Sequence, residues 1–295
     1  MVLMYRFLQN LKKNLPPRQL DLLKKTYHIF FPGVIRNYGI YERFLAEKNG
    51  LEIGGPSSIF KATGILPLYS IVGNLDGCNF SENTIWEGDI KKGQTYAYTK
   101  GDKKGYQYIC DAGSLINVQS GKYDFVLASH VLEHIANPLK AFSEWLRVLK
   151  KDGLILLVVP HRDGTFDHYR PVALFQHLLE DYHSNVGEDD LTHLPEVLKL
   201  HDLSLDPPAG DYESFKKRSL LNYENRCLHH HVFNTRLVME ILNHFDIRIL
   251  AIDLYRPHHI IILGKKQSKG AIEDNATFLS RNKRLFISSP FISDR

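Results

Sequence analysis

Glycines and acidic residues follow the ends of three predicted strands, where they could hold a ligand. The run LEIGG at residues 51–55 ends in two glycines, and Gly54 and Gly55 let the backbone turn sharply and leave room beside the main chain. Asp76 ends the predicted second strand, at the spacing where an acid accepts hydrogen bonds from a ribose diol. Asp111 ends the third strand, where a carboxylate can accept from an adenine amino group. Together, these glycines and acidic residues predict a site for an adenosine-shaped ligand.

The turn itself indicates which adenosine compounds fit. A pair of glycines alone could be only a tight turn. The turn reads GGPSS rather than GxGxxG, and the chain contains no GKS or GKT, so a dinucleotide site and a phosphate-cradling loop are disfavoured. S-adenosylmethionine carries no phosphate, and its loop needs small residues without an anion nest. Ser57 and Ser58 could cap a helix that follows the turn.

Histidines are the candidate general bases, because their pKa lies near neutrality. A hydroxyl acceptor must lose its proton to such a base, or bind a metal, when it takes a methyl group. His161 directly follows the predicted fifth strand and is flanked by Arg162 and Asp163, which makes it the first choice. His168, in the segment TFDHYRP, and His134, in LEH, are the other candidates. A structural role at a helix start is an equal alternative for His134.

Three adjacent histidines at 229–231 raise the question of a metal site. In a strand, His229 and His231 would share one face, and Asp190 or His193 could complete a ligand set. The spacing matches no closed zinc motif, and adjacent histidines more often form a solvated or hydrogen-bonded turn. We therefore expect no metal site.

The elements that must position these residues indicate an α/β fold. From residue 48 onward, apolar runs of strand length alternate with amphipathic helical stretches, which is typical of a parallel sheet covered on both faces. The last two predicted strands, at 246–256 and 258–266, are separated only by a short turn and should form an antiparallel hairpin at the sheet edge. Residues 81–105 form an insertion that could contain a small hairpin.

The predicted organisation has three parts: an N-terminal helical segment at 1–47, a main domain at 48–266 and a polar tail at 267–295. Within the domain, a histidine-rich insertion at 161–233 follows the fifth strand, and we expect it to form the acceptor side of the site. A helix near residues 4–15 should pack on the main domain; the alternatives are a flap over the site or a weak contact with a membrane surface. The tail should be loose, although LFISSPFI could dock.

Two segments resemble the class I S-adenosylmethionine-dependent methyltransferases, in particular the branch related to ubiquinone-biosynthesis methyltransferases. They are LEIGG and YDFVLASHVLEHIANPLKAFSEWLRVLKKDGLILLVVP. The resemblance covers roughly residues 48–160 and resumes weakly at 234–264. It implies a Rossmann-like, seven-stranded sheet whose last strand is antiparallel. In place of the family's usual second glycine, this chain has Pro56.

By that resemblance, the cofactor S-adenosylmethionine contacts Glu52, Gly54 and Gly55 at its methionine end, Asp76 at the ribose, Asp111 and Ala112 at the adenine, and Ser129 and His130 beside the methyl group. The segments TFDHYRP, EDDLTH and LHHHVF also resemble bacterial methyltransferases found beside glycan-assembly genes. The function expected is O-methylation of a sugar, glycan or small metabolite. The alternatives are a non-catalytic binding protein on the same fold and a nicotinamide-dependent oxidoreductase.

Composition excludes several other classes. A formal net charge of +4 on 295 residues does not favour nucleic acid as a partner. The longest apolar run, at 154–159, is far shorter than the roughly 20 residues of a membrane span, and the N-terminus lacks signal-peptide features. Three cysteines without a CxxC pair are typical of a reducing compartment, so a cytoplasmic location is expected.

Overall fold

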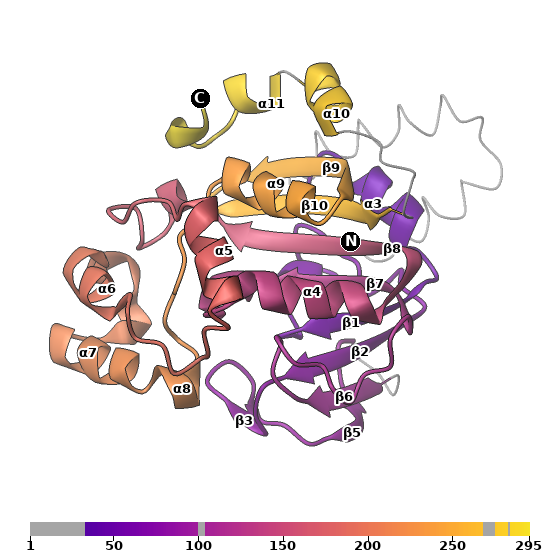
Figure 1. Ribbon diagram of the computed structural model, residues 1–295. Helices are drawn as coiled ribbons and strands as arrows, with labels where there is room; N and C mark the ends of the chain where they lie inside the picture. Colours follow the sequence, from indigo (N-terminus) through magenta and orange to yellow (C-terminus); the bar gives the residue numbers. More distant parts are fainter. Residues whose placement is uncertain (1–32, 100–103, 268–274, 283) are drawn as a thin grey trace.

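A mixed eight-stranded sheet forms the centre of the protein in the computed structural model, which describes residues 33–99, 104–267, 275–282 and 284–295 (Figure 1). The strand order is β5-β6-β2-β1-β7-β8-β10-β9. The strands are β1 (Asn49–Ile53), β2 (Asn74–Asn79), β5 (Gly93–Tyr96), β6 (Gly105–Ile109), β7 (Tyr123–Ser129), β8 (Leu149–Pro160), β9 (Ile247–Tyr255) and β10 (His259–Lys266).

The pairing confirms the predicted α/β fold with a mainly parallel central sheet. Strands β6, β2, β1, β7 and β8 are parallel, and β10 lies antiparallel between β8 and β9. The last two strands form the expected hairpin at the edge. The sheet has one strand more than expected, because β5 in the 81–105 insertion pairs antiparallel with β6. The same insertion contains a small hairpin of β3 (Asn83–Thr84) and β4 (Gly88–Asp89).

The connection from β1 to β2 differs from the helix expected there. Residues 54–73 contain only a 3-10 turn at Ser58–Phe60, and Ser57 makes no capping bond. The chain folds back on this turn so closely that a Cβ at Gly64 would lie 2.2 Å from the carbonyl oxygen of Ile59. Close backbone packing at Gly64 therefore closes the loop that connects β1 to β2 without a crossover helix.

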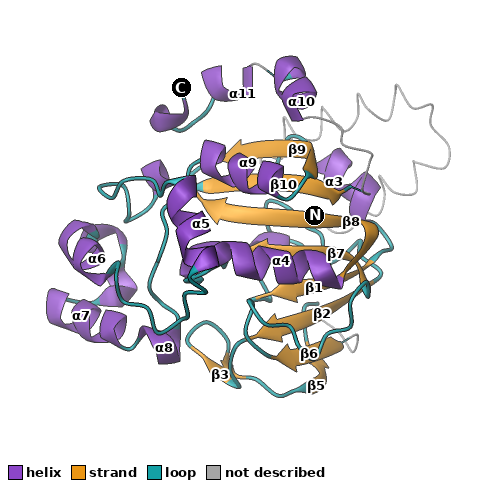
Figure 2. Cartoon of the chain, in the orientation of Figure 1, coloured by secondary structure: helices purple, strands orange, loops and turns teal. Residues whose placement is uncertain are grey.

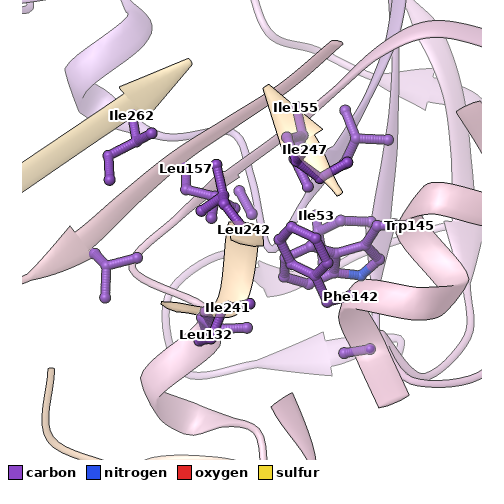
Figure 3. Close-up of a cluster of buried hydrophobic side chains, with 14 of the residues drawn as sticks. Ile53, Leu132, Phe142, Trp145, Ile155, Leu157, Ile241, Leu242, Ile247 and Ile262 are labelled. Carbon is purple, nitrogen blue, oxygen red and sulfur yellow. The ribbon is translucent and has the colours of Figure 1, made fainter. Parts of the chain in front are cut away.

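Helices cover the two faces of the sheet unequally (Figure 2). They are α3 (Tyr38–Leu45), α4 (Pro138–Val148), α5 (Phe175–His183), α6 (Leu194–Leu200), α7 (Tyr212–Leu220), α8 (Asn222–Asn225), α9 (Thr235–His244), α10 (Asn275–Arg281) and α11 (Arg284–Ile287). Helices α4 and α9 contribute to the larger core, where Phe142 and Trp145 pack with Ile53 and Leu242 (Figure 3). Helix α3 contributes to the core on the other face. No helix of the described residues is long and apolar enough to cross a membrane.

The N-terminal segment was expected to contain a helix that packs on the main domain, and the C-terminal tail was expected to be loose. The helix predicted near residues 4–15 lies outside the described residues. Helix α3 is tied to the sheet edge by the hydroxyl of Tyr41, which donates to Asp253 at 2.8 Å. At the other end, Phe291 is buried and stacks on His161, with the ring centroids 4.0 Å apart. The tail around LFISSPFI therefore docks, as the alternative expectation had it.

Removing the Phe291 ring should destabilise the fold, because a buried aromatic truncated to alanine typically costs about 3 kcal/mol. Phe291→Ala should therefore lower the free energy of unfolding by about that amount in urea denaturation. Ile292→Ala is the matched control, since Ile292 is 80% exposed and should change little. Equal stability of Phe291→Ala and the parent would contradict a docked tail.

Candidate functional site

Two adjoining hollows lie at the carboxyl ends of β1, β2, β6 and β7, where open α/β sheets bind ligands. They have volumes of about 60 and 470 Å³ and share Gly54, Trp86, Val131 and His134 along their common wall. Together they form one cleft. The smaller hollow has an apolar floor and two carboxylates, those of Asp111 and Glu188, whereas the larger one is lined mainly by polar side chains.

Gly54 forms the turn at the centre of the cleft. Its φ of +74° lies in the left-handed region, and a Cβ there would lie 2.6 Å from Val131 Cγ2. Its N–H donates to the carbonyl oxygen of Cys78 at 2.8 Å, which joins the turn to β2. Only glycine therefore fits this position, and a ligand in either hollow lies against the main chain.

Glu52 lies beneath the turn rather than in either hollow. It is fully buried, and its carboxylate accepts hydrogen bonds from the N–H and hydroxyl of Ser57 and from the hydroxyls of Tyr69 and Tyr96. Burial raises the pKa of Glu52, and these hydrogen bonds oppose the rise. A Cβ at Gly55 would lie 2.3 Å from both Glu52 Cδ and Tyr96 Oη. Glu52 and Gly55 thus shape the loop that lines the cleft.

Asp76 does not end the second strand, so its expected location is wrong. Strand β2 begins only at Asn74 and continues to Asn79. The carboxylate of Asp76 is buried and accepts from Tyr123 Oη at 2.6 Å, Lys122 Nζ at 3.1 Å and the N–H of Tyr106 at 2.9 Å. The residue ties β2 to β6 and β7 and lines neither hollow.

Asn79 occupies the strand end that had been assigned to Asp76. Its amide donates to the carbonyl oxygen of Gly55 at 3.0 Å and accepts from Trp86 Nε1 at 3.1 Å. Phe80 follows it and packs against Trp86 with centroids 5.7 Å apart. These three residues line the smaller hollow and were missed. In the sequence, Gly73 precedes NLDGCN and marks where the strand begins. A strand that begins there ends at Asn79 rather than at Asp76.

Asp111 and Ala112 lie in the smaller hollow, as expected. Asp111 Oδ1 accepts from the N–H of Gly113 at 2.8 Å, while Oδ2 is 3.4 Å from Arg226 of the insertion. Arg226 also pairs with Glu188 at 2.6 Å, and both line the hollow. Burial raises the pKa of Glu188, Arg226 lowers it and Asp111 raises it further. The insertion therefore contributes one charged wall of the cleft.

The larger hollow contains a chain of titratable side chains. Ser129, His130 and His259 line it. Nε2 of His130 is 3.0 Å from Nδ1 of His259, and Nδ1 of His130 is 3.4 Å from the buried carboxylate of Glu133. Burial opposes ionisation of Glu133, but His130 and the other nearby histidines lower its pKa. A carboxylate that orients an imidazole is the usual arrangement of a general base.

His134 lines both hollows, and of the three predicted bases it alone faces the cleft. Burial lowers its pKa to about 4, with a further contribution from His229, whose ring lies edge-on at 4.5 Å. The ring is therefore neutral at neutral pH. Its buried Nδ1 has no hydrogen-bond partner among the described residues.

His161 and His168, the other two candidate general bases, line neither hollow. His161 is fully buried: Nδ1 accepts from the N–H of Asp163, and Nε2 lies 3.3 Å from Asp294. His168 Nδ1 contacts the carbonyl oxygen of Thr165 at 3.0 Å. The C-terminal tail, which the sequence did not place, covers His161.

The adjacent histidines do not share one face of a strand, because residues 227–231 have no regular secondary structure. His229 lies 2.5 Å from Asp167 and His231 lies 2.9 Å from Asp181. Arg170 is buried beneath them and donates to the carbonyl oxygen of His229. The segment is therefore packed rather than solvated.

Comparison with known proteins places the cleft in a family context. Residues 70–157 match the family model described as a methyltransferase domain, a range that runs from before β2 to within β8. No curated protein matches the chain.

Solved structures with a related arrangement share little sequence with this chain. A SAM-dependent methyltransferase from Aquifex aeolicus is 13% identical with a TM-score of 0.43, covering 86% of this chain and 100% of that one. A possible histamine N-methyltransferase from Thermotoga maritima is 13% identical with a TM-score of 0.41, covering 84% and 97%. A methyltransferase from Mesorhizobium loti is 9% identical with a TM-score of 0.44, covering 75% and 92%. Similarity at this level carries no conclusion about the acceptor.

Replacing Asp76 should weaken the fold rather than the cleft. Asp76→Ala leaves Tyr123, Lys122 and the N–H of Tyr106 without their acceptor, so the free energy of unfolding should fall by about 2 kcal/mol. Asp124→Ala is the control, because the partly exposed Asp124–Lys150 pair should contribute less than about 1 kcal/mol. Calorimetric titration of folded Asp76→Ala with S-adenosylmethionine should give nearly parental affinity. A tenfold loss of affinity would instead show that Asp76 contacts the ligand.

Proposed function

Because residues 70–157 match the methyltransferase domain model, the chain carries an S-adenosylmethionine-dependent methyltransferase domain, and we propose that it methylates a hydroxyl oxygen of a sugar, glycan or small metabolite. The observation that carries the proposal is the polar, histidine-containing hollow beside the cofactor hollow. The coarser statement, a methyltransferase that uses S-adenosylmethionine, rests on the family match.

The smaller hollow has the composition that an adenosine group requires. Ile53, Ala112 and Ile135 offer apolar surface, and Phe80 offers an aromatic face. We assign the adenine amino group to Asp111 and the ribose hydroxyls to Asn79 in place of Asp76. Gly54 leaves the main chain open beside the methionine group. No phosphate-binding nest is needed, which suits a cofactor without phosphate.

The larger hollow supports a polyhydroxylated acceptor. Ser58, Lys61 and Glu87 supply hydrogen-bonding groups around its rim. Trp86 is 43% exposed at the wall shared by both hollows, and its ring offers a flat apolar face for a sugar ring. A hydroxyl placed near Ser129 and His130 would lie beside the cofactor's methionine end.

The histidine chain could remove the acceptor proton. S-adenosylmethionine, when bound, supplies an electrophilic methyl group. Burial and the neighbouring His130 lower the pKa of His259 to about 3, so its imidazole is neutral at neutral pH and can accept a hydrogen bond from the acceptor hydroxyl. Glu133 holds His130, and His130 in turn contacts His259, so positive charge that develops on the chain faces a buried carboxylate.

A non-catalytic binding protein is the second candidate, because Arg226 already pairs with Asp111 and narrows the smaller hollow. The protein is incubated with an isotope-labelled methyl donor and a panel of monosaccharides, sugar nucleotides and cell metabolites. Mass spectrometry of the products then distinguishes an enzyme from a binding protein. A labelled methyl ether supports the enzyme. Cofactor binding without any labelled product supports the binding protein.

Asp111→Ala should lower affinity for S-adenosylmethionine at least tenfold, because a hydrogen bond to a charged group contributes roughly 1.5–3 kcal/mol. Calorimetric titration with S-adenosylmethionine measures this affinity. Asp89→Ala, in the exposed β4 strand, is the control and should bind like the parent. If Asp111→Ala folds and keeps parental affinity, the adenine assignment is wrong.

His130→Gln should lower the turnover rate by roughly 10²–10⁴-fold, the usual cost of losing a general base. The rate should be measured with the acceptor identified by the labelling experiment, at saturating cofactor. Cofactor affinity should change far less than the rate. His168→Gln is the control, because its ring lies outside both hollows. A His130→Gln variant with parental turnover would contradict the chain of Glu133, His130 and His259 as the base, and would leave His134 as the remaining candidate.

A further inference from the structure

We propose that His177, Asp181, His193 and His231 bind a divalent transition-metal ion, with zinc the best fit, at a structural site inside the insertion. One donor atom from each of the four side chains lies within 4.8 Å of the other three. None of the four lines either hollow of the cleft. The site is therefore separate from the proposed methyl-transfer chemistry.

Three separate stretches of chain bring the donors together. His177 and Asp181 are four residues apart on α5, so their side chains project from the same face of that helix. His193 precedes α6, and His231 lies in the irregular segment before α9. An ion here would cross-link parts of the insertion that are otherwise joined mainly by loops.

The distances between donors fit a tetrahedral ion. Zinc–nitrogen bonds of about 2.0–2.1 Å place neighbouring ligand atoms about 3.3 Å apart in a tetrahedron. Nε2 of His177 and Nε2 of His193 are 3.1 Å apart. Asp181 Oδ2 lies 2.9 Å from Nε2 of His231 and 3.6 Å from Nε2 of His177. These separations bracket the tetrahedral value, and Nε2 of His177 and Oδ2 of Asp181 each take part in two of the three contacts.

The donor types also favour zinc. Three imidazole nitrogens and one carboxylate oxygen are borderline ligands that suit zinc better than magnesium or calcium, which prefer oxygen-only sets. Asp181 and His231 are buried, whereas the His177 side chain is 37% exposed and leaves a route for the ion. Hydrogen bonds alone would give the same contacts between these side chains. Measuring the metal content therefore distinguishes a metal site from a hydrogen-bonded cluster.

A metal at this place would hold the wall of the cleft. His231 belongs to the segment in which the N–H of His230 donates to the carbonyl oxygen of Glu133 at 2.8 Å. Two residues before His231, the ring of His229 packs against His134 of the cleft. The side-chain amide of Asn137 also donates to the carbonyl oxygen of Asp181. Fixing His231 and Asp181 thus fixes the backbone behind His134 and Glu133.

The direct test measures zinc in the full chain, expressed without a polyhistidine tag. Mass spectrometry of the purified protein for metals should find one zinc per chain after dialysis. Removal with a chelator should lower the melting temperature, and zinc should restore it. Cobalt added to the metal-free protein should give the visible absorption bands of a tetrahedral ion. Absence of bound zinc, together with no cobalt band and no change in melting temperature, overturns the proposal.

Variants distinguish these donors from any other zinc site. Loss of a residue that only supports a ligand weakens metal affinity about 10–100-fold, so loss of a ligand should exceed about 100-fold. Asp181→Asn keeps the side-chain volume and should show that loss in a cobalt titration. His183→Ala, an exposed histidine on the same helix, should bind like the parent.

His193→Gln serves as a second variant, because His193 is only half-buried and its replacement should disturb packing less than replacement of the buried His231. Circular dichroism of each metal-free variant checks that it is folded. Parental metal affinity in both folded variants overturns the proposal even if the chain contains zinc. Since the readouts are metal content, absorption and melting temperature, the result does not depend on whether the methyl-transfer proposal holds.

Discussion

The buried carboxylate of Glu52 is the interaction on which the cleft depends. A carboxylate without water is costly unless its oxygens are hydrogen-bonded, and Glu52 receives donors from Ser57, Tyr69 and Tyr96. These partners come from the loop after β1 and from the extra strand β5, so one group joins three segments. The turn at Gly54 then has a single conformation beside Val131. The crossover helix that would normally fix such a turn is missing, and this hydrogen-bond cluster takes its place.

Much of the fold followed from the sequence, because apolar runs and their spacing are set by burial. The parallel strands other than β2 and the final hairpin were predicted correctly on that basis. The error at Asp76 has the same origin: LPLYSIVG is apolar enough for a strand but packs as a loop, and β2 begins only after it. The apolar pattern identifies what is buried, not which hydrogen bonds are made. The added strand β5 depends on pairing with β6, which no local pattern reveals.

The site was predicted less completely, because its remaining residues come from segments distant in sequence. Gly54, Asp111 and His130 end core strands, and the sheet brings such ends together. Arg226 and Glu188 reach the cleft from the insertion, and His259 reaches it from the last strand. His161 follows β8 directly, as a general base should, yet Phe291 and Asp294 cover it. The position of His161 at the end of a strand does not reveal that a tail more than a hundred residues away covers it.

The insertion contains its own electrostatic core, and this core keeps the charged wall of the cleft in place. Burial alone would raise the pKa of Asp167, but His229 and Arg170 lower it to about 2. A folded-state pKa below the usual value means that Asp167 contributes stability above its unfolded pKa. That contribution is lost only as the pH falls from about 4 toward 2. Arg170 also donates to the carbonyl oxygens of His229 and His230. The backbone behind His134 is therefore held by the buried pair of Asp167 and Arg170, in which Asp167 remains ionised at neutral pH.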